Sequence, residues 1–243
     1  MKLIVAGSTG FVAGEIIRQA LANPAITSIV ALGRRPAPEP ANTGPTADVT
    51  KLKSVILQDL GNEYPESVKK ELSGADACIW TIAITPSKSA TMPWEQTVKV
   101  CRDYAIKGIE TLSQLPRGSQ GKTPLRFVYI SGSNSERDPS KKPMILGDYC
   151  LMRGEAESRI LELAKQSNGA VEACVAKPGL ISGPEKPAAI LQRAFLSLIG
   201  VPGIKVSEVS AALVHQVVNG FEKETLLNED MVRIAQGVLE GQK

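Results

Sequence analysis

The sequence predicts an α/β protein built on a doubly wound parallel sheet with helices on both faces. Short apolar runs rich in β-branched residues alternate along the chain with longer segments of helical periodicity. Hydrophobic residues make up 43% of the 243 positions and aromatic residues only 4%, so an aliphatic core is expected. Regular alternation of strand and helix favours parallel strands that are joined by right-handed crossover connections.

In the first half of the chain, apolar runs bounded by turn residues predict four strands, over Lys2–Ala6, Ser28–Leu32, Leu52–Leu57 and Ala75–Ile84. Apolar residues recurring every three or four positions predict two helices between these strands, over Phe11–Leu21 and Glu66–Leu72. The proline-rich stretch from Pro36 to Pro45 is interpreted as a surface loop and not as a domain boundary.

The second half continues the alternation with a helical region, a fifth strand, a strongly periodic helix and a sixth strand, over Trp94–Leu115, Leu125–Ile130, Asp148–Gln166 and Val171–Ala176. The remainder is expected to be mainly helical. An irregular segment, Gly132–Gly147, falls where the loops at strand carboxyl ends gather, which is the usual place for a ligand crevice. Because no repeat or long linker interrupts the pattern, residues 1–243 are predicted to form one domain, with 183–205 shaping a substrate pocket.

Composition excludes several classes of protein. A formal net charge of +3, spread along the chain, does not favour a nucleic-acid surface. No stretch approaches the roughly 18 apolar residues of a membrane span, and the first apolar run is too short for a signal peptide. The four cysteines form no CxxC pair, so neither a metal site nor a disulfide framework is predicted. We therefore expect a cytoplasmic protein with buried free thiols and a small-molecule substrate; the sequence does not indicate its oligomeric state.

A glycine loop follows the first strand directly. It reads Gly7-Ser8-Thr9-Gly10-Phe11-Val12, with Ala13 three positions after the second glycine. Glycines let the backbone approach a pyrophosphate, and the helix that follows presents free N–H groups and the positive end of its dipole. Between an N-terminal strand and a helix, this loop predicts a dinucleotide site. A tight turn without a ligand is the alternative.

The end of the second strand indicates which dinucleotide is preferred. NAD-binding folds place an acid there for the ribose hydroxyls, whereas this chain has Arg34 and Arg35. Paired arginines suit the additional phosphate of NADP(H), although two solvated surface arginines would look the same. Asp59 and Leu60, after the third strand, are predicted to line the adenine pocket, with a turn aspartate as the alternative.

These motifs resemble the short-chain dehydrogenase/reductase superfamily, most closely its atypical and extended NmrA-like members. The resembling segments occur in the family's order, at Gly7–Ala13, Gly33–Arg35, Asp59–Leu60, Phe127–Ser133, Tyr149–Glu157 and Lys177–Gly183. The resemblance implies an NAD(P)-binding Rossmann fold. It also implies that Thr81, Ile82 and Ala83 line the middle of the cofactor, and that the backbone of Lys177, Pro178, Gly179 and Leu180 flanks the nicotinamide amide.

In this superfamily a serine after the fifth strand and a Tyr-x-x-x-Lys motif carry the chemistry. The resemblance makes Tyr149 the acid that protonates a carbonyl oxygen, with Arg153 in the place of the lysine and either Ser131 or Ser133 orienting the substrate. A phenol with an ordinary pKa near 10 needs a nearby cation to move towards neutrality. Arginine supplies that charge but does not relay a proton as lysine does.

Helical spacing indicates where these side chains point. Positions 149, 153, 156, 160 and 163 form one stripe, whose later members are apolar, so Tyr149 and Arg153 are predicted to face the sheet. The alternative is an exposed i,i+4 pair between Arg153 and Glu157 with Tyr149 merely packed.

The function predicted first is an NADPH-dependent oxidoreductase acting on a small carbonyl or enone compound. The few charges between Gly183 and Gly203, together with Phe195, favour an apolar or aromatic substrate. Two alternatives stay open: an NADP(H)-binding regulatory protein of NmrA type, and a non-redox isomerase, epimerase or dehydratase on the same scaffold.

Overall fold

A seven-stranded parallel sheet forms the centre of the protein in a computed structural model, which describes residues 1–40, 43–117, 123–183 and 202–240. Its strands are β1 (Lys2–Ala6), β2 (Ser28–Gly33), β3 (Leu52–Ile56), β4 (Ala77–Trp80), β5 (Leu125–Ile130), β6 (Val171–Lys177) and β9 (Thr225–Leu227). They lie in the order β3-β2-β1-β4-β5-β6-β9. The predicted doubly wound parallel sheet is confirmed.

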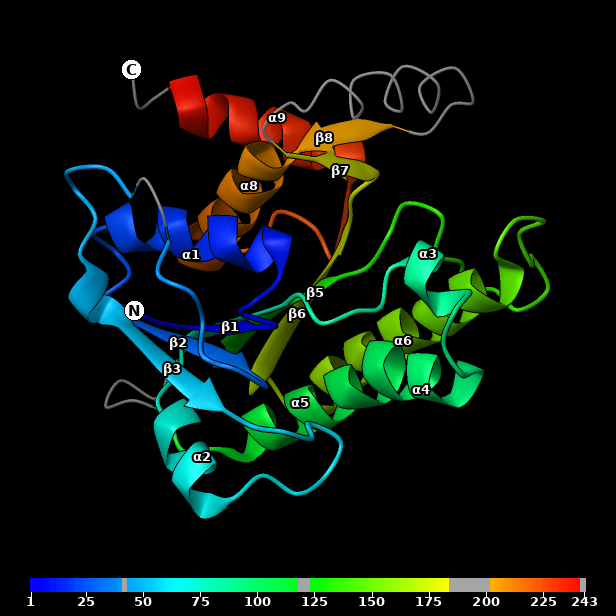
Figure 1. The fold of residues 1–243 in the computed structure, drawn as a ribbon, viewed down its shortest axis with the longest axis horizontal. Helices are drawn as coiled ribbons and strands as arrows, with labels where there is room; N and C mark the ends of the chain where they lie inside the picture. The colour runs from blue at the N-terminus through cyan, green and yellow to red at the C-terminus, as the bar shows by residue number, and fades with distance from the viewer. Residues whose placement is uncertain (41–42, 118–122, 184–201, 241–243) are drawn as a thin grey trace.

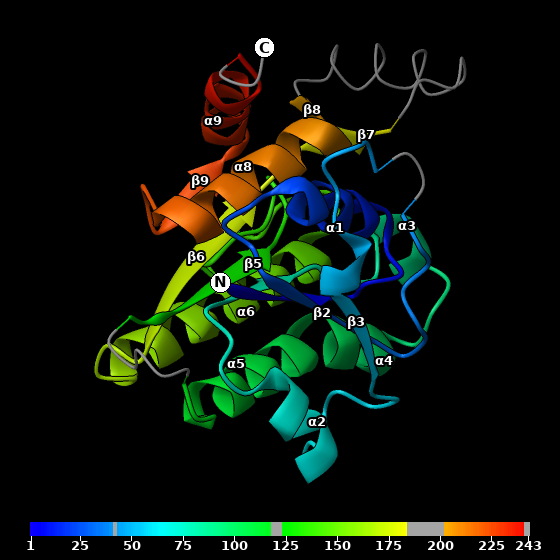
Figure 2. The same cartoon turned by 90° about the vertical axis from the view of Figure 1, so that its left-hand side faces the viewer.

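Helices cover both faces of this sheet (Figure 1). One face carries α1 (Phe11–Ala22), α8 (Val206–Asn219) and α9 (Asn228–Glu240), and the other carries α2 (Glu66–Leu72), α5 (Tyr104–Gln114) and α6 (Gly147–Gln166). Figure 2 shows the same three layers from the side. Alternate residues of each strand point to opposite faces, so the sheet contributes to two separate aliphatic cores.

The strand order reverses at β1, which has β2 on one side and β4 on the other. In sheets of this kind a crevice opens beyond the carboxyl ends of the strands at the reversal point. The loops that follow β1, β2 and β4 meet there. The sheet therefore brings the predicted cofactor segments together.

Three features differ from the sequence-based expectation. The described residues after β6 are mainly helical, as predicted, but they also contain three short strands that were not predicted: β7 (Leu180–Ser182) pairs with β8 (Gly203–Lys205), and β9 joins the main sheet. β4 is shorter than predicted, ending at Trp80. The helical region before β5 consists of α4 (Trp94–Val98), a π-helical turn η2 (Lys99–Asp103) and α5.

Two short helices were not predicted, namely η1 (Val49–Lys51) and α3 (Pro86–Ser89). All four cysteines are buried, as expected. Among the described residues, no helix combines the length and the apolar character that crossing a bilayer requires. Most of the predicted substrate segment, 184–201 with Phe195, lies outside the described residues.

Candidate cofactor and active site

The glycine loop turns sharply between β1 and α1. Gly7 has a φ of +90°, and a Cβ at this position would lie 2.5 Å from the Thr81 Oγ1 atom. A side chain here would meet both backbone strain and a clash with the end of β4. Gly10 precedes the first turn of α1, which no side chain of the described residues caps and which contains no acid. The N–H groups at this helix end are therefore suited to bind an anion.

Ser8 provides a second, independent sign of a ligand. Its side chain is only 1% exposed, yet its hydroxyl has no hydrogen-bond partner among the described residues. A Cβ on Gly33 would lie 2.8 Å from this hydroxyl oxygen, so Ser8 faces the end of β2. An unsatisfied buried hydroxyl is costly unless a ligand or water completes it.

The other loop residues lie at the surface of the same crevice. Thr9, Arg34 and Arg35 are exposed, and Val12 is half-buried. The Phe11 ring is 56% exposed, and a Cβ on Gly183 would lie 2.8 Å from its Cζ atom. The structure thus brings the glycine loop, the end of β2 and the segment after β7 to one edge of the sheet.

Asp59 follows β3 and is held in a turn. Its carboxylate accepts hydrogen bonds from the Lys99 Nζ atom at 2.8 Å and from the Gly61 N–H at 2.9 Å. These bonds, that of Lys99 foremost, lower the pKa of Asp59. The neighbouring Leu60 is buried. This geometry matches the turn aspartate that the sequence left as an alternative, and the adenine-pocket role stays a prediction.

The end of β4 packs directly against the glycine loop. The Thr81 hydroxyl donates to the Ala6 carbonyl at 2.8 Å. Ile82 is half-buried and Ala83 is exposed, so the side chains of these two residues remain accessible at the edge of the crevice. Their role in lining the middle of a dinucleotide stays a prediction.

Arg153 faces inward, as the helical stripe predicts. The side chain is 2% exposed, and its guanidinium carbon lies 4.8 Å from the centre of the Tyr129 ring. It donates hydrogen bonds to the main-chain carbonyls of Ile130 and Cys101. The Cys101 carbonyl belongs to the π-helical turn η2 and also accepts the Tyr129 hydroxyl at 2.8 Å. The alternative surface pair with Glu157 does not form.

Tyr149 is held as a neutral phenol. Its hydroxyl donates to the Ile84 carbonyl at 2.8 Å. Burial raises the pKa of Tyr149 to about 12, and the positive charge of Arg153 offsets only part of that rise. In the protein without ligand, the phenol therefore carries its proton at neutral pH, as a proton donor must.

All four tyrosines are expected to titrate abnormally. Burial is the first cause of the raised pKa of Tyr64, Tyr104, Tyr129 and Tyr149. The folded state keeps its phenol protons where the unfolded chain loses them, so stability is complete below pH 10 and falls as the pH rises above it. Absorbance at about 295 nm should show little tyrosinate in the folded protein at pH 10, where free tyrosine is about half ionised. Substantial tyrosinate absorbance in folded protein at that pH would contradict this prediction.

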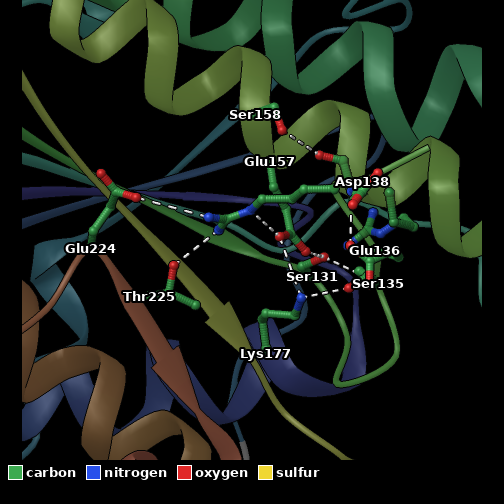
Figure 3. Close-up of polar contacts among 12 residues, drawn as sticks. Ser131, Ser135, Glu136, Asp138, Glu157, Ser158, Lys177, Glu224 and Thr225 are labelled. Atoms are coloured by element: carbon green, nitrogen blue, oxygen red, sulfur yellow. Dashed lines mark hydrogen bonds and ion pairs between the residues drawn. The ribbon is translucent and has the colours of Figure 1, made fainter. Parts of the chain in front are cut away.

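Glu157, which the sequence suggested only as the partner of an exposed pair, is a buried carboxylate on α6, two helical turns after Tyr149. Glu157 is 0% exposed and accepts the Arg137 Nε–H at 2.7 Å and the Ser131 hydroxyl at 2.5 Å (Figure 3). Arg137 also donates to the Thr225 hydroxyl at 2.9 Å, which joins this cluster to β9. An acid four residues after an inward-facing arginine was the available signal, but the same spacing occurs in surface ion pairs.

The end of β6 adjoins this cluster. The Lys177 Nζ atom donates to the Ser135 carbonyl at 2.6 Å and lies 3.5 Å from the Glu157 carboxylate. Pro178 accepts the Ser133 N–H at 2.9 Å, and the Gly179 N–H donates to the Asn228 side chain at 2.9 Å. The adjoining Leu180 is half-buried. Ser131, Ser133 and Lys177–Leu180 thus lie together, at the ends of adjacent strands.

A hollow of about 480 Å³ is lined by residues of α4, η2, α6 and the loop after β5, and it shares Arg137 with the cluster around Glu157. Its lining includes Trp94, Arg102, Arg137, Leu151 and Glu155. None of the residues that the sequence predicts for cofactor binding or catalysis lines it. We therefore place the candidate site at the strand ends and not in this hollow.

Solved structures with the same architecture identify the fold. MoeE5, solved in complex with UDP-glucuronic acid and NAD, superposes with a TM-score of 0.66 at 19% identity, covering 93% of this chain and 75% of MoeE5. This chain has a Rossmann fold. Vestitone reductase from alfalfa (Medicago sativa) shares the Rossmann fold with a TM-score of 0.65 at 22% identity, over 93% of this chain and 76% of the reductase.

Sequence comparison finds two relatives among curated proteins. Protein FMP52, mitochondrial, from Candida albicans is 24% identical over 255 aligned positions, covering 98% of this chain and all of that protein. The fmp52 protein from Emericella nidulans is 26% identical over 197 positions, covering 80% of this chain and 74% of its own length. No family model matches the chain.

The names of these relatives correct one expectation. Composition predicted a cytoplasmic protein, but both curated relatives are named mitochondrial. That prediction was wrong, because widely separated cysteines and a short first apolar run do not distinguish one reducing compartment from another.

Proposed function

We propose that this protein is an NADPH-dependent oxidoreductase that acts on a small apolar or aromatic carbonyl or enone compound. The observation that carries the proposal is the buried Ser8 hydroxyl beside the α1 terminus, since no side chain of the described residues bonds this hydroxyl or caps this helix end. It faces the end of β2, where Arg34 and Arg35 are exposed. A polyanionic dinucleotide with an additional ribose phosphate fits this combination of donors and charges.

The residues of the chain have separate roles in the proposed reaction. The N–H groups at the start of α1 hold the pyrophosphate, and the two arginines hold the ribose phosphate. The bound cofactor would supply a hydride to the carbonyl carbon. Tyr149 gives its proton to the carbonyl oxygen, while a serine at the end of β5 orients that oxygen. Arg153, fixed against Tyr129, supplies positive charge near the phenol.

The preference for NADPH is tested with the double variant R34A/R35A. We expect the Kd for NADPH to rise by roughly ten- to a hundredfold, because two charge-assisted contacts to phosphate are lost, while the Kd for NADH stays the same. Titration followed by nicotinamide fluorescence measures both constants. R159A is the matched control, since Arg159 is an exposed arginine on α6. Equal losses for both cofactors would contradict the assignment of these arginines to the phosphate.

The location is part of the same proposal. Since both curated relatives are named mitochondrial, we propose that this chain acts in mitochondria. Fractionation of cells that express the tagged protein tests this. Recovery of the protein away from the mitochondrial fraction would reject it.

A further inference from the structure

Glu157 lies against two cations and one hydroxyl. The Arg137 Nε and Lys177 Nζ atoms lie 2.7 Å and 3.5 Å from its Oε2 atom (Figure 3). The Ser131 hydroxyl donates to its Oε1 atom at 2.5 Å.

The Ser131 hydroxyl is consequently not free to donate a hydrogen bond to a substrate. A hydroxyl carries one proton, and the Ser131 hydroxyl donates its proton to the Glu157 side chain. The Ser135 hydroxyl oxygen lies 2.9 Å from that of Ser131 and occupies a second side of it. The Ser131 hydroxyl thus points towards α6 and the adjoining turn, and it cannot donate to a carbonyl oxygen without breaking its bond to Glu157.

Ser133 is presented differently. A hydrogen bond of 3.0 Å from the Ser135 N–H to the Gly132 carbonyl closes a turn that has Ser133 as a central residue. The Ser133 N–H is anchored to Pro178 at 2.9 Å, and Lys177 anchors the far end of the turn at the Ser135 carbonyl. Among the described residues, the Ser133 hydroxyl makes one hydrogen bond, a long one of 3.4 Å to the Asn134 side chain.

We infer that Glu157 is a positioning residue, which binds the Ser131 hydroxyl and steadies the turn so that Ser133 is the serine that donates to the substrate oxygen. Glu157 accepts the Ser131 hydroxyl at the start of the turn, and Lys177 donates to the Ser135 main-chain carbonyl at its end. This inference rests on the proposed function, since it assigns the serine of that reaction.

The kinetic test compares S133A, S131A and E157Q with the intact protein on a carbonyl substrate. We expect S133A to lower kcat about a hundredfold, as loss of a donor to a developing oxyanion does. S131A and E157Q should each lower kcat about tenfold with an unchanged KM for NADPH, and E157Q should cost nothing further when added to S133A. D230N is the control, because Asp230 is another buried carboxylate paired with a lysine. An S131A loss equal to that of S133A overturns the inference, as does wild-type kcat in E157Q.

A thermal unfolding cycle tests the contact without turnover. S131A and E157Q should each lower the melting temperature, and the double variant should melt no lower than E157Q alone. Additive shifts overturn the role of Glu157 even if the enzyme is active. A protein that binds NADPH but reduces no carbonyl compound overturns the proposed function and, with it, the role of Ser133. The unfolding cycle would still show whether Glu157 holds Ser131.

Discussion

Tyr149→Phe is expected to lower kcat by roughly two to four orders of magnitude, the usual contribution of a positioned general acid. The substitution removes the only atom of this side chain that can protonate a carbonyl oxygen. It also removes the bond to the Ile84 carbonyl, but the ring stays packed against its neighbours. Steady-state oxidation of NADPH, followed by absorbance, measures the loss, and titration should give an unchanged Kd for NADPH.

Tyr64→Phe is the matched control for that experiment. Tyr64 is another buried tyrosine, and its hydroxyl has no hydrogen-bond partner among the described residues. Removing this hydroxyl should leave kcat unchanged. Retained turnover in the Tyr149 variant would reject the proposed acid, and a comparable loss in both variants would indicate a general effect on packing.

Gly154→Ala is expected to destabilise the protein by about 3 kcal/mol or more, at the upper end of overpacking effects. The polypeptide after β5 crosses α6 at Gly154 so closely that a Cβ there would lie 1.8 Å from the Glu136 carbonyl oxygen. The obstacle is backbone and cannot rotate away, so the loop that carries Arg137 must be displaced. Denaturant unfolding measures the change in free energy.

Gly237→Ala supplies the comparison. Gly237 is also helical, in α9, but a Cβ there would meet no atom of the described residues within 4 Å. Replacing an unobstructed helical glycine by alanine should stabilise the protein by about 0.5–1 kcal/mol. The two substitutions are thus expected to change stability in opposite directions. Similar small changes at both sites would show that the loop does not cross α6 as described.

Most of the fold was predictable because its signals are local. The strands from β1 to β6 are short aliphatic runs, and the pattern of apolar residues gave α2 with its observed ends. β9 was missed because three residues are too few to show a pattern, and only contact with β6 makes them a strand. The turn η2 was missed because a π turn changes the helical period by a single residue.

Site residues could be predicted where spacing along the sequence determines their place, and not where packing between distant segments does. The glycine loop and the inward stripe of α6 could be inferred from spacing. Spacing could not decide between Ser131 and Ser133, because their difference lies in which partner each hydroxyl meets. Glu157 shows the same limit. It is buried with two hydrogen bonds and an ion pair only because the loop with Arg137 and the end of β6 with Lys177 pack against it.

The main-chain acceptor in η2 has a consequence for how this protein tolerates mutation. The Cys101 carbonyl receives hydrogen bonds from Tyr129 on β5 and from Arg153 on α6, so one backbone atom joins three elements. A carbonyl is common to all amino acids, so no single-codon substitution at position 101 can delete it. Inserting or deleting one codon in η2 would move it. This contact therefore depends on the helical register of η2 and not on which residue occupies position 101. Homologous sequences are expected to show substitutions in η2 more often than insertions or deletions.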